Sequence, residues 1–362
     1  MPIAANTAPT PVSIESSSNV LSVEVCEPTN RSAWDSFVGT HPHGSFYHLY
    51  GWKSVNEQAL GHQSIYLMAR DANSVRGVLP LVFVRSRLFG RILCSMPFVN
   101  FGGPCATDPP TYNLLMQAAT TKANELRADY VELRSAEPVT TSLPVSLRKI
   151  SMTLDLQSDP DKVWDAFSSK HRTAIRRSYK NDLEVYSGGA ELLPIFYKVM
   201  QNSWQSLGTP LYALSYFERI MATFGEDARI FVCHRKQEPV AVAFNGHANE
   251  TVEGMWAGGN PLARSLQANY VLYWEMIKDG CLRGYKKYHL GRSTADSAGE
   301  DFKKKWNATS KQLHWYFHRP DGGPMPELNV DNPKYKLAIA AWQRLPMWAT
   351  GLLGPPIARL IP

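Results

Sequence analysis

Two stretches of the chain repeat one pattern of apolar and polar positions. Each has two β-rich apolar runs separated by a polar turn, then a third run, a glycine loop, an apolar-periodic helix and a last β-rich run. The first copy covers residues 60–135 and ends in "YVELRS", and the second covers residues 225–293 and ends in "YHLGRS". Because the order is the same in both copies, we predict an internal duplication.

The two copies align residue by residue around their glycine loops and last strands. Antiparallel strands followed by a β-α-β crossover are typical of the acetyltransferase-like (GNAT) architecture. We therefore predict a mixed α/β (α+β) fold made of two tandem GNAT-like acyltransferase domains. The expected equivalent pairs are Gly102 and Gly258, Gly103 and Gly259, Tyr130 and Tyr288, Arg134 and Arg292, and Ser135 and Ser293.

The length and composition of the chain allow two globular units. It has 362 residues, of which 44% are hydrophobic, so it can bury two cores. We expect a disordered tail at 1–19, a first domain at 20–150, a second domain at 151–318 and an extension at 319–362. The extension is apolar but interrupted by prolines and by Arg359. Packing back on the domains is therefore expected, and peripheral membrane contact is the alternative.

Charge and cysteine content narrow the class of protein. The formal net charge of +6 is mildly basic, which favours a phosphate-bearing partner but falls short of a dedicated DNA-binding protein. The five cysteines are scattered, with no C-x-x-C pair, so we expect them to be reduced and structural and predict no metal site. The first residues lack the features of a signal peptide, which predicts a cytoplasmic protein.

The segment "DFKKKW" at 301–306 places three lysines between two aromatic residues. On a helix Phe302 and Trp306 are four residues apart, so both rings anchor one face. At about 100° per residue, Lys303 and Lys305 flank this buried stripe and Lys304 points away. One or two lysines can then reach a neighbouring cleft. The alternative is a solvated basic face.

Further basic and aromatic residues are candidates for substrate binding. Arg172, Arg176 and Lys180 follow one another at intervals of four, and such a stripe suits phosphate oxygens, although a solvated helix face has about equal weight. Trp204 and Tyr212 flank a Gly-Thr-Pro turn, and such aromatic residues shape a ligand pocket or fill a core. The segment "SFYHLYGWKSV" adds three more candidates, which are Tyr47, Trp52 and Lys53.

The segment "RSLQAN" at 264–269 bears on the donor. Acetyl-CoA enzymes of the GNAT type show an Arg/Gln-x-x-Gly-x-Gly/Ala turn whose backbone amides hold a pyrophosphate at a helix N-terminus. Here Arg264 is in position, but Gln267 and Asn269 stand where the glycines belong. Side chains at these positions disfavour close approach of a pyrophosphate. The segment therefore argues against acetyl-CoA as donor.

Over residues 40–318 the chain resembles the FemABX group of aminoacyltransferases, which carry two GNAT-like domains. The motifs behind the resemblance are "SFYHLYGWKSV", "SSKHRTAIRRSYKNDLEV", "GNPLARSLQANYVLYWEMIKDGCLRGYKKYHLGRS" and "DFKKKW", the last similar to the family's Phe-Lys signature. With "WQSLGTPLY" and the C-terminal segment, the chain looks most like the branch found beside exosortase/PEP-CTERM and exopolysaccharide gene sets.

The resemblance implies transfer of an aminoacyl or acyl group onto an amine of an envelope, peptidoglycan-precursor or exopolysaccharide component. Aminoacyl-tRNA is the implied co-substrate, acyl-CoA is less favoured, and no tightly bound cofactor is expected. Lys303 and Arg292 would stabilise the oxyanion, while Lys53 and the basic helix with Arg172 and Arg176 would hold acceptor phosphates. The further implied substrate-binding residues are Tyr47, Trp52, Trp204, Tyr212 and Lys305.

Two other functions remain open from the sequence. One is a GNAT N-acyltransferase that uses acyl-CoA or an acyl carrier protein, and the other is a non-catalytic binding protein that kept the fold. The segment "SLGTPLY" also replaces an arginine-containing segment expected in enzymes that act on wall precursors. The identity of the acceptor therefore stays open.

Overall fold

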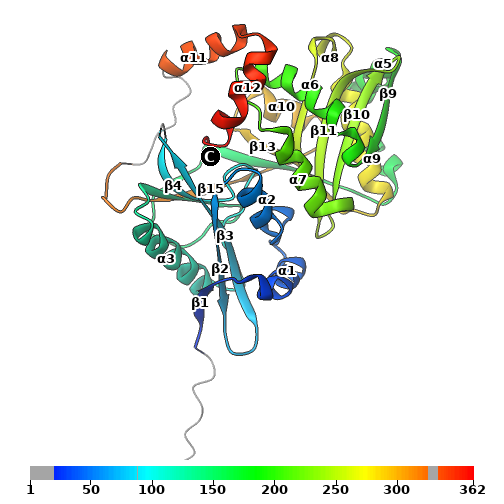
Figure 1. The fold of residues 1–362 in the computed structure, drawn as a ribbon. Helices are drawn as coiled ribbons and strands as arrows, with labels where there is room; N and C mark the ends of the chain where they lie inside the picture. Colours follow the sequence, from blue (N-terminus) through cyan, green and yellow to red (C-terminus); the bar gives the residue numbers. More distant parts are fainter. Residues whose placement is uncertain (1–19, 88, 325–332) are drawn as a thin grey trace, which may run out of the picture.

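The computed structural model describes residues 20–87, 89–324 and 333–362, and the predicted tail at 1–19 lies outside them. Two mixed β-sheets, each flanked by helices, make up the molecule (Figure 1). Short 3₁₀ helices occur at Pro28–Asn30, Phe46–His48, Ala190–Leu192 and Gly225–Asp227. All five cysteines are free and buried.

The first sheet is built mainly from the first copy of the repeat. Helix α3 (Pro109–Glu125) covers one face, and α1 (Arg31–Thr40) and α2 (Trp52–Gln58) cover the other (Figure 1). Alternate residues of the central strands face the two layers, as the two-residue period of a strand requires. The strand order is β1 (Ser22–Val25), β2 (Gln63–Arg70), β3 (Val75–Ser86), β4 (Gly90–Ser95), β6 (Tyr130–Ser135), β15 (His314–His318) and β7 (Val145–Ser146), with β5 (Cys105–Ala106) paired to β3.

The second sheet is built mainly from the second copy. One face carries α4 (Pro160–Ala166), α5 (Ser169–Tyr179), α8 (Pro261–Ser265) and α9 (Ala268–Leu282), and the other carries α6 (Leu193–Ser206) and α7 (Leu214–Phe224). The strand order is β14 (Thr309–Gln312), β8 (Lys149–Asp155), β13 (Lys287–Thr294), β12 (Thr251–Gly259), β11 (Glu238–Ala248), β10 (Ala228–Arg235) and β9 (Leu183–Gly188).

The predicted fold class and the predicted order of the repeat are confirmed. β2, β3, β4, α3 and β6 match β10, β11, β12, α9 and β13 in order and in strand pairing, including the final parallel pair. The predicted equivalence of the glycines is wrong. Gly258 lies inside β12, opposite Val242, whereas Gly102 lies in a loop that follows β4. The first copy has the longer loop, which the shared pattern did not reveal.

One strand of the second half joins the sheet of the first half, and the two halves share a core. β15, expected in the second domain, pairs with β6 of the first sheet, and only Leu313 separates it from β14 of the second sheet. One apolar core contains residues of α1, α2, α6 and α7 together. In that core the ring of Phe46 lies 4.6 Å from the ring of Phe224. The domain boundaries at 150 and 318 stay a prediction.

The C-terminal helices α11 (Pro333–Arg344) and α12 (Met347–Ala358) lie beside α6 (Figure 1). The side-chain amide of Gln343 donates to the carbonyl oxygen of Ser206 over 2.8 Å. The Nε2 atom of His62 lies 2.7 Å from the carbonyl oxygen of Arg359, next to β2. Within the described ranges no helix is both long and apolar enough to cross a membrane.

Candidate active site

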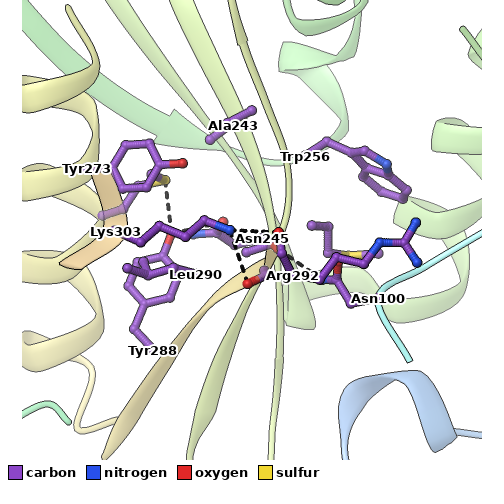
Figure 2. A pocket seen from close by; sticks show the side chains of 14 residues that line it. Asn100, Ala243, Asn245, Trp256, Tyr273, Tyr288, Leu290, Arg292 and Lys303 are labelled. Atoms are coloured by element: carbon purple, nitrogen blue, oxygen red, sulfur yellow. Dashed lines mark hydrogen bonds between the residues drawn. The ribbon is translucent and has the colours of Figure 1, made fainter. Parts of the chain in front are cut away.

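The candidate site lies where the parallel strands β12 and β13 separate. The two strands pair over only three positions, from Thr251 with Lys287 to Glu253 with His289. Beyond them a register shift and a positive φ of 77° at Gly291 turn β13 away from β12. A cavity of about 200 Å³ opens between the strands (Figure 2).

The corresponding place in the first copy is filled. β4 and β6 also pair over three positions, but the backbone N–H of Arg134 then donates to Ser95 Oγ over 2.7 Å. The loop after β4 closes on the same strand, because Gly102 N–H donates to the Arg134 carbonyl oxygen over 3.2 Å. A Cβ atom on Gly103 would meet that carbonyl oxygen at 2.8 Å. The second copy is therefore the one with room for a ligand between its strands.

Lys303 projects into this cavity from α10 (Ala298–Lys304). Its side chain is buried, and Nζ donates to the carbonyl oxygens of Gly291 over 3.1 Å and Arg292 over 2.9 Å. Burial, with the charge of Arg292, lowers the pKa of Lys303 to about 8. An ammonium has three N–H donors, so one remains for a ligand in the cavity.

The aromatic anchor predicted around the lysines holds α10 in place. Trp306 is fully buried, with its ring stacked on Tyr273 at 5.8 Å and edge-on to His171 at 4.4 Å. Lys304 points to solvent and pairs with Glu300 at 2.8 Å. Lys305 is also exposed and does not line the cavity.

Arg292 lies between this cavity and a second one. Its guanidinium points away from Lys303, toward the side of Trp256 (Figure 2). There it enters a cavity of about 190 Å³ with aromatic walls. The buried Nη1 atom has no hydrogen-bond partner in the described part of the chain. Burial, with the nearby charge of Arg134, lowers the pKa of Arg292 to about 10.

Comparison with known proteins supports the expected fold and family type. Residues 169–304 match the acetyltransferase (GNAT) domain family. The crystal structure of FemX superposes with a TM-score of 0.64 at 16% identity, over 87% of this chain and all of that chain. A tandem GNAT protein from the clavulanic acid biosynthesis pathway superposes with a TM-score of 0.51 at 11% identity, over 85% of this chain and all of that one. The fold is a tandem GNAT fold.

A curated relative adds a similarity in sequence. The UDP-N-acetylmuramoylpentapeptide-lysine N(6)-alanyltransferase of Weissella viridescens is 28% identical over 156 residues, which are 42% of this chain and 46% of the relative. The match thus spans about half the length of that protein. Together with the GNAT domain match and FemX, it supports a FemABX-like type.

The tandem GNAT fold brings several predicted site residues together. Tyr47, Trp204 and Tyr212 line the second cavity together with the guanidinium of Arg292. Tyr47 comes from the first half of the chain and Trp204 from the second, so the cavity lies between the two halves. Asn100, Met255, Trp256 and Arg292 line both cavities, which are therefore adjacent.

Other predicted substrate-binding residues line neither cavity of the described structure. Trp52 is a core residue whose Nε1 donates to the Phe46 carbonyl oxygen over 2.8 Å. Lys53 pairs with Glu57 at 2.9 Å on the surface of α2. Their helix, α2, precedes the first copy of the repeat.

The basic helix α5 packs on α9, on the face of the second sheet opposite α6 and α7. Arg172 pairs with Asp165 at 3.1 Å, and the exposed Arg176 lies 5.3 Å from the ring of Trp164. Both arginines therefore cover the outer surface around α4 and α5, and neither is in either cavity.

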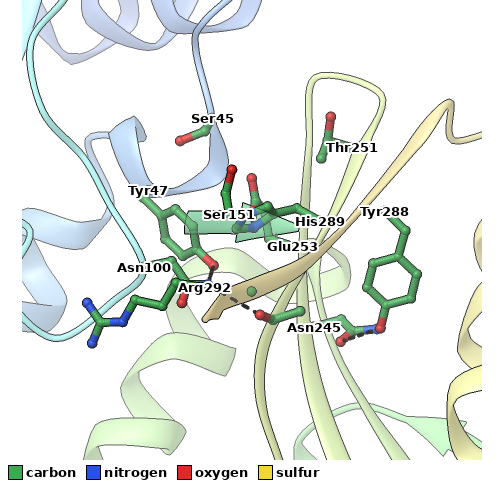
Figure 3. A network of polar contacts seen from close by, with 12 residues as sticks. Ser45, Tyr47, Asn100, Ser151, Asn245, Thr251, Glu253, Tyr288, His289 and Arg292 are labelled. Atoms are coloured by element: carbon green, nitrogen blue, oxygen red, sulfur yellow. Dashed lines mark hydrogen bonds and ion pairs between the residues drawn. The ribbon is translucent and has the colours of Figure 1, made fainter. Parts of the chain in front are cut away.

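Sequence reasoning missed a polar network beside the site (Figure 3). Asn100 Nδ2 donates to the Tyr47 hydroxyl over 2.7 Å and to the Gly254 carbonyl oxygen over 3.3 Å, which joins the two halves. The buried His289 and Glu253 pair over 2.7 Å on adjacent strands. The sequence does contain a signal for this pair, because a polar residue lies inside each of two apolar strands. Asn100 had no such signal, because it lies in an irregular loop.

The turn at 264–269 differs from a pyrophosphate-binding turn in its contacts as well as in its residues. Gln267 has a φ of 56°, a conformation that glycine adopts without strain. Its side-chain oxygen accepts from Ser178 Oγ over 3.3 Å, and the Leu266 carbonyl oxygen accepts from Asn181 over 2.9 Å. The end of α5 therefore occupies part of the approach to this turn.

Proposed function

We propose that the chain is a FemABX-type transferase that moves an aminoacyl or acyl group onto an amine of a cell-envelope component. The observation that carries the proposal is the buried Lys303 in the open gap between β12 and β13, inside the region that matches the GNAT family. The curated relative is named for alanyl transfer to a lysine N6 of a peptidoglycan precursor. That name supports an amine acceptor. Aminoacyl-tRNA is the donor that the resemblance to the FemABX group implies.

Lys303 would act on the charge that develops during transfer. When the acceptor amine attacks the ester carbonyl, a C–N bond forms and the carbonyl oxygen becomes an oxyanion. The C–O bond to the tRNA ribose then breaks, and the ribose hydroxyl leaves with the proton that the amine gives up. Two backbone carbonyls hold the Lys303 ammonium, and its remaining N–H can donate to the oxyanion.

The direct test is transfer from labelled alanyl-tRNA, seryl-tRNA and glycyl-tRNA to UDP-N-acetylmuramoyl-pentapeptide and to lysine-containing peptides. Mass spectrometry of the acceptor should show the added residue on an amine. Material that co-purifies with the protein, examined for tRNA, CoA and nucleotide sugars, identifies other donors and acceptors. Absence of transfer from every aminoacyl-tRNA, with turnover of acyl-CoA instead, would refute the donor in this proposal.

An N-acyltransferase that uses acyl-CoA or an acyl carrier protein is the second candidate. The description of the matched family, an acetyltransferase domain, favours it. The side chain of Gln267 and the contacts of the turn with α5 speak against it. Calorimetry should detect weak or no binding of acetyl-CoA, and micromolar affinity would put this candidate first.

We further propose that the protein works in the cytoplasm at the inner face of the membrane, in a pathway of the exosortase and exopolysaccharide type. The support for membrane contact is the exposure of Leu337, Trp348 and Leu352 on α11 and α12, at 75%, 74% and 70%. Exposed apolar side chains grouped on neighbouring elements are typical of an interaction surface.

A further inference from the structure

The two equivalent arginines of the duplicated fold have opposite surroundings. Arg134 ends β6 in the first copy, and its Nε donates to Glu132 Oε1 over 2.7 Å with both side chains buried. Arg292 ends β13 in the second copy, where Leu290 takes the position of Glu132. The arginine of the second copy thus lacks the carboxylate partner that its counterpart has.

The same tryptophan lies beside both arginines. The ring of Trp315, on β15, is 4.5 Å from the guanidinium carbon of Arg134 and 5.4 Å from that of Arg292. Stacking on an aromatic ring fixes the plane of a guanidinium and leaves its N–H edge free for a planar partner. The first copy shows that this partner is a carboxylate at Arg134.

An unpaired guanidinium between aromatic walls is costly to the folded protein. Its charge is partly removed from water, and the repulsion from Arg134 adds to the cost. Arg292 nevertheless lines the cavity of Tyr47, Trp204 and Tyr212, and its buried Nη1 atom has no hydrogen-bond acceptor among the described residues. A group that is unfavourable for folding but directed into a cavity is typical of a binding site.

We propose that the Arg292 cavity binds a carboxylate of the acceptor substrate in the place that Glu132 occupies beside Arg134. The assignment of this carboxylate to the acceptor rests on the proposed function, but the site itself does not. Because the two cavities share Asn100, Met255, Trp256 and Arg292, a molecule held there extends toward Lys303. The acceptor class is therefore an amino acid or peptide that has both a free carboxylate and an amine.

A carboxylate suits this cavity better than a phosphate does. Arginine binds the two oxygens of a carboxylate with two parallel N–H bonds. A phosphate presents more oxygens and usually receives several charged donors, whereas the cavity residues supply one guanidinium and no lysine. The aromatic walls also suit an apolar side chain next to the anionic group.

The first experiment measures binding rather than transfer. Nα-acetyl-alanine, Nα-acetyl-leucine and Nα-acetyl-lysine are titrated beside their primary amides, with tryptophan fluorescence and calorimetry as readouts, and inorganic phosphate is the competing anion. We expect at least one acid to bind about tenfold or more tightly than its amide, since hydrogen bonds to charged groups contribute about 1.5–3 kcal/mol. Arg292→Gln should abolish this preference, and Arg292→Lys should weaken it because lysine lacks the planar fork.

The variant Lys303→Met separates this site from the proposed reaction. It should keep the preference for acids over amides even if it has lost transfer, so failure of the proposed function would leave the binding result intact. Equal binding of acids and amides by the native protein would overturn the carboxylate site. So would an undiminished preference in Arg292→Gln, or tighter binding of phosphate than of every acid.

A stability comparison excludes a merely structural role for Arg292. Arg292→Gln should raise the thermal midpoint, because it removes a partly buried charge that has no partner among the described residues. Arg134→Gln should lower the midpoint, because it leaves Glu132 buried without its cation. If Arg292→Gln lowers the midpoint as much as Arg134→Gln does, Arg292 is a structural residue and the proposal is wrong.

Discussion

At the scale of single residues, the three consecutive lysines at the C-terminal end of α10 have different surroundings. Lys303 is buried and bonded to two backbone carbonyls, Lys304 pairs with Glu300, and Lys305 is exposed. The neighbours of Lys303 therefore serve as matched controls for a change of charge in the same helix. Of these three lysines, only Lys303 lines the cavity between β12 and β13.

Replacing each lysine by methionine should separate these roles. Lys303→Met is expected to reduce transfer about a hundredfold or more, because it removes a donor to the oxyanion. Lys304→Met and Lys305→Met should change activity and stability by no more than about 0.5 kcal/mol, since both side chains are exposed. Initial rates and thermal midpoints of the three variants are the measurement. Equal rates in all three would exclude a catalytic role for Lys303.

The lowered pKa of Lys303 predicts opposite pH dependences for activity and stability. Activity that needs the ammonium should fall above a pH of about 8. The unfolded chain keeps this lysine protonated up to its ordinary pKa of 10.5. Between these values the unfolded state binds more protons, so the contribution of Lys303 to the free energy of unfolding rises with pH.

Rates and urea denaturation from pH 7 to 10, compared between the native protein and Lys303→Met, test this prediction. The variant should lack both the decline in rate near pH 8 and the Lys303 contribution to stability. If the residual activity of the variant declined in the same way, the decline near pH 8 would belong to a group other than Lys303.

At the scale of elements, α10 is positioned by one buried ring. Trp306 contacts Tyr273 on α9 and His171 on α5, so it joins the helix that carries Lys303 to the layer behind the sheet. At the gap, β13 positions the carbonyl oxygens of Gly291 and Arg292 that accept from Lys303. The geometry of the site therefore depends on both elements.

Truncation of this anchor should affect folding and transfer together. Trp306→Ala is expected to lower the free energy of unfolding by about 3–5 kcal/mol, the usual range for removing a buried aromatic side chain. It should also reduce transfer, because α10 loses its support. Trp306→Phe keeps a ring, and Nε1 of Trp306 has no partner in the described part of the chain, so this control should stay closer to the native protein. Similar losses in both variants would contradict the packing explanation.

At the scale of the whole molecule, two features join the two halves. These are the strand β15, which crosses to the first sheet, and the common core. Phe46 of the first half packs on Phe224 of the second, and Asn249 Nδ2 donates to the Val38 carbonyl oxygen over 2.6 Å. Separate unfolding of one half would expose this core. The GNAT copies are therefore expected to behave as one cooperative unit.

Calorimetry should show a single unfolding transition. Phe46→Ala should lower its midpoint without splitting it, because both halves lose the same contact. Fluorescence and circular dichroism followed in urea should give coincident curves for the native protein and the variant. Two resolved transitions in the native protein would contradict this prediction.

The exposed apolar residues of the C-terminal helices predict binding to vesicles. Trp348→Glu should weaken co-sedimentation with anionic phospholipid vesicles, because a charge in place of an apolar ring opposes insertion. Leu282→Glu is the control, since Leu282 is 69% exposed at the end of α9, on another part of the surface. Equal weakening by both changes would indicate a nonspecific charge effect instead of a docking surface.

The sequence by itself determined the order of the elements, the duplication and the local geometry of α10. Hydrophobic periodicity reports which face of a helix or strand is buried, and this was enough to place Lys303 beside the Phe302 and Trp306 anchor. The resemblance in "DFKKKW" then pointed to the residue that lines the cavity. These features depend on neighbours within one or two turns of the chain.

Only the tertiary structure decided which residues share the site. Periodicity cannot tell what covers a buried face, so the expected burial of Trp52 did not decide whether it lies in a core or in a substrate pocket. Segments far apart in the sequence meet where β15 pairs with β6 and where Asn100 contacts Tyr47. The direction of the Arg292 guanidinium likewise depends on packing between such segments. Such choices depend on packing between elements, which a local pattern does not contain.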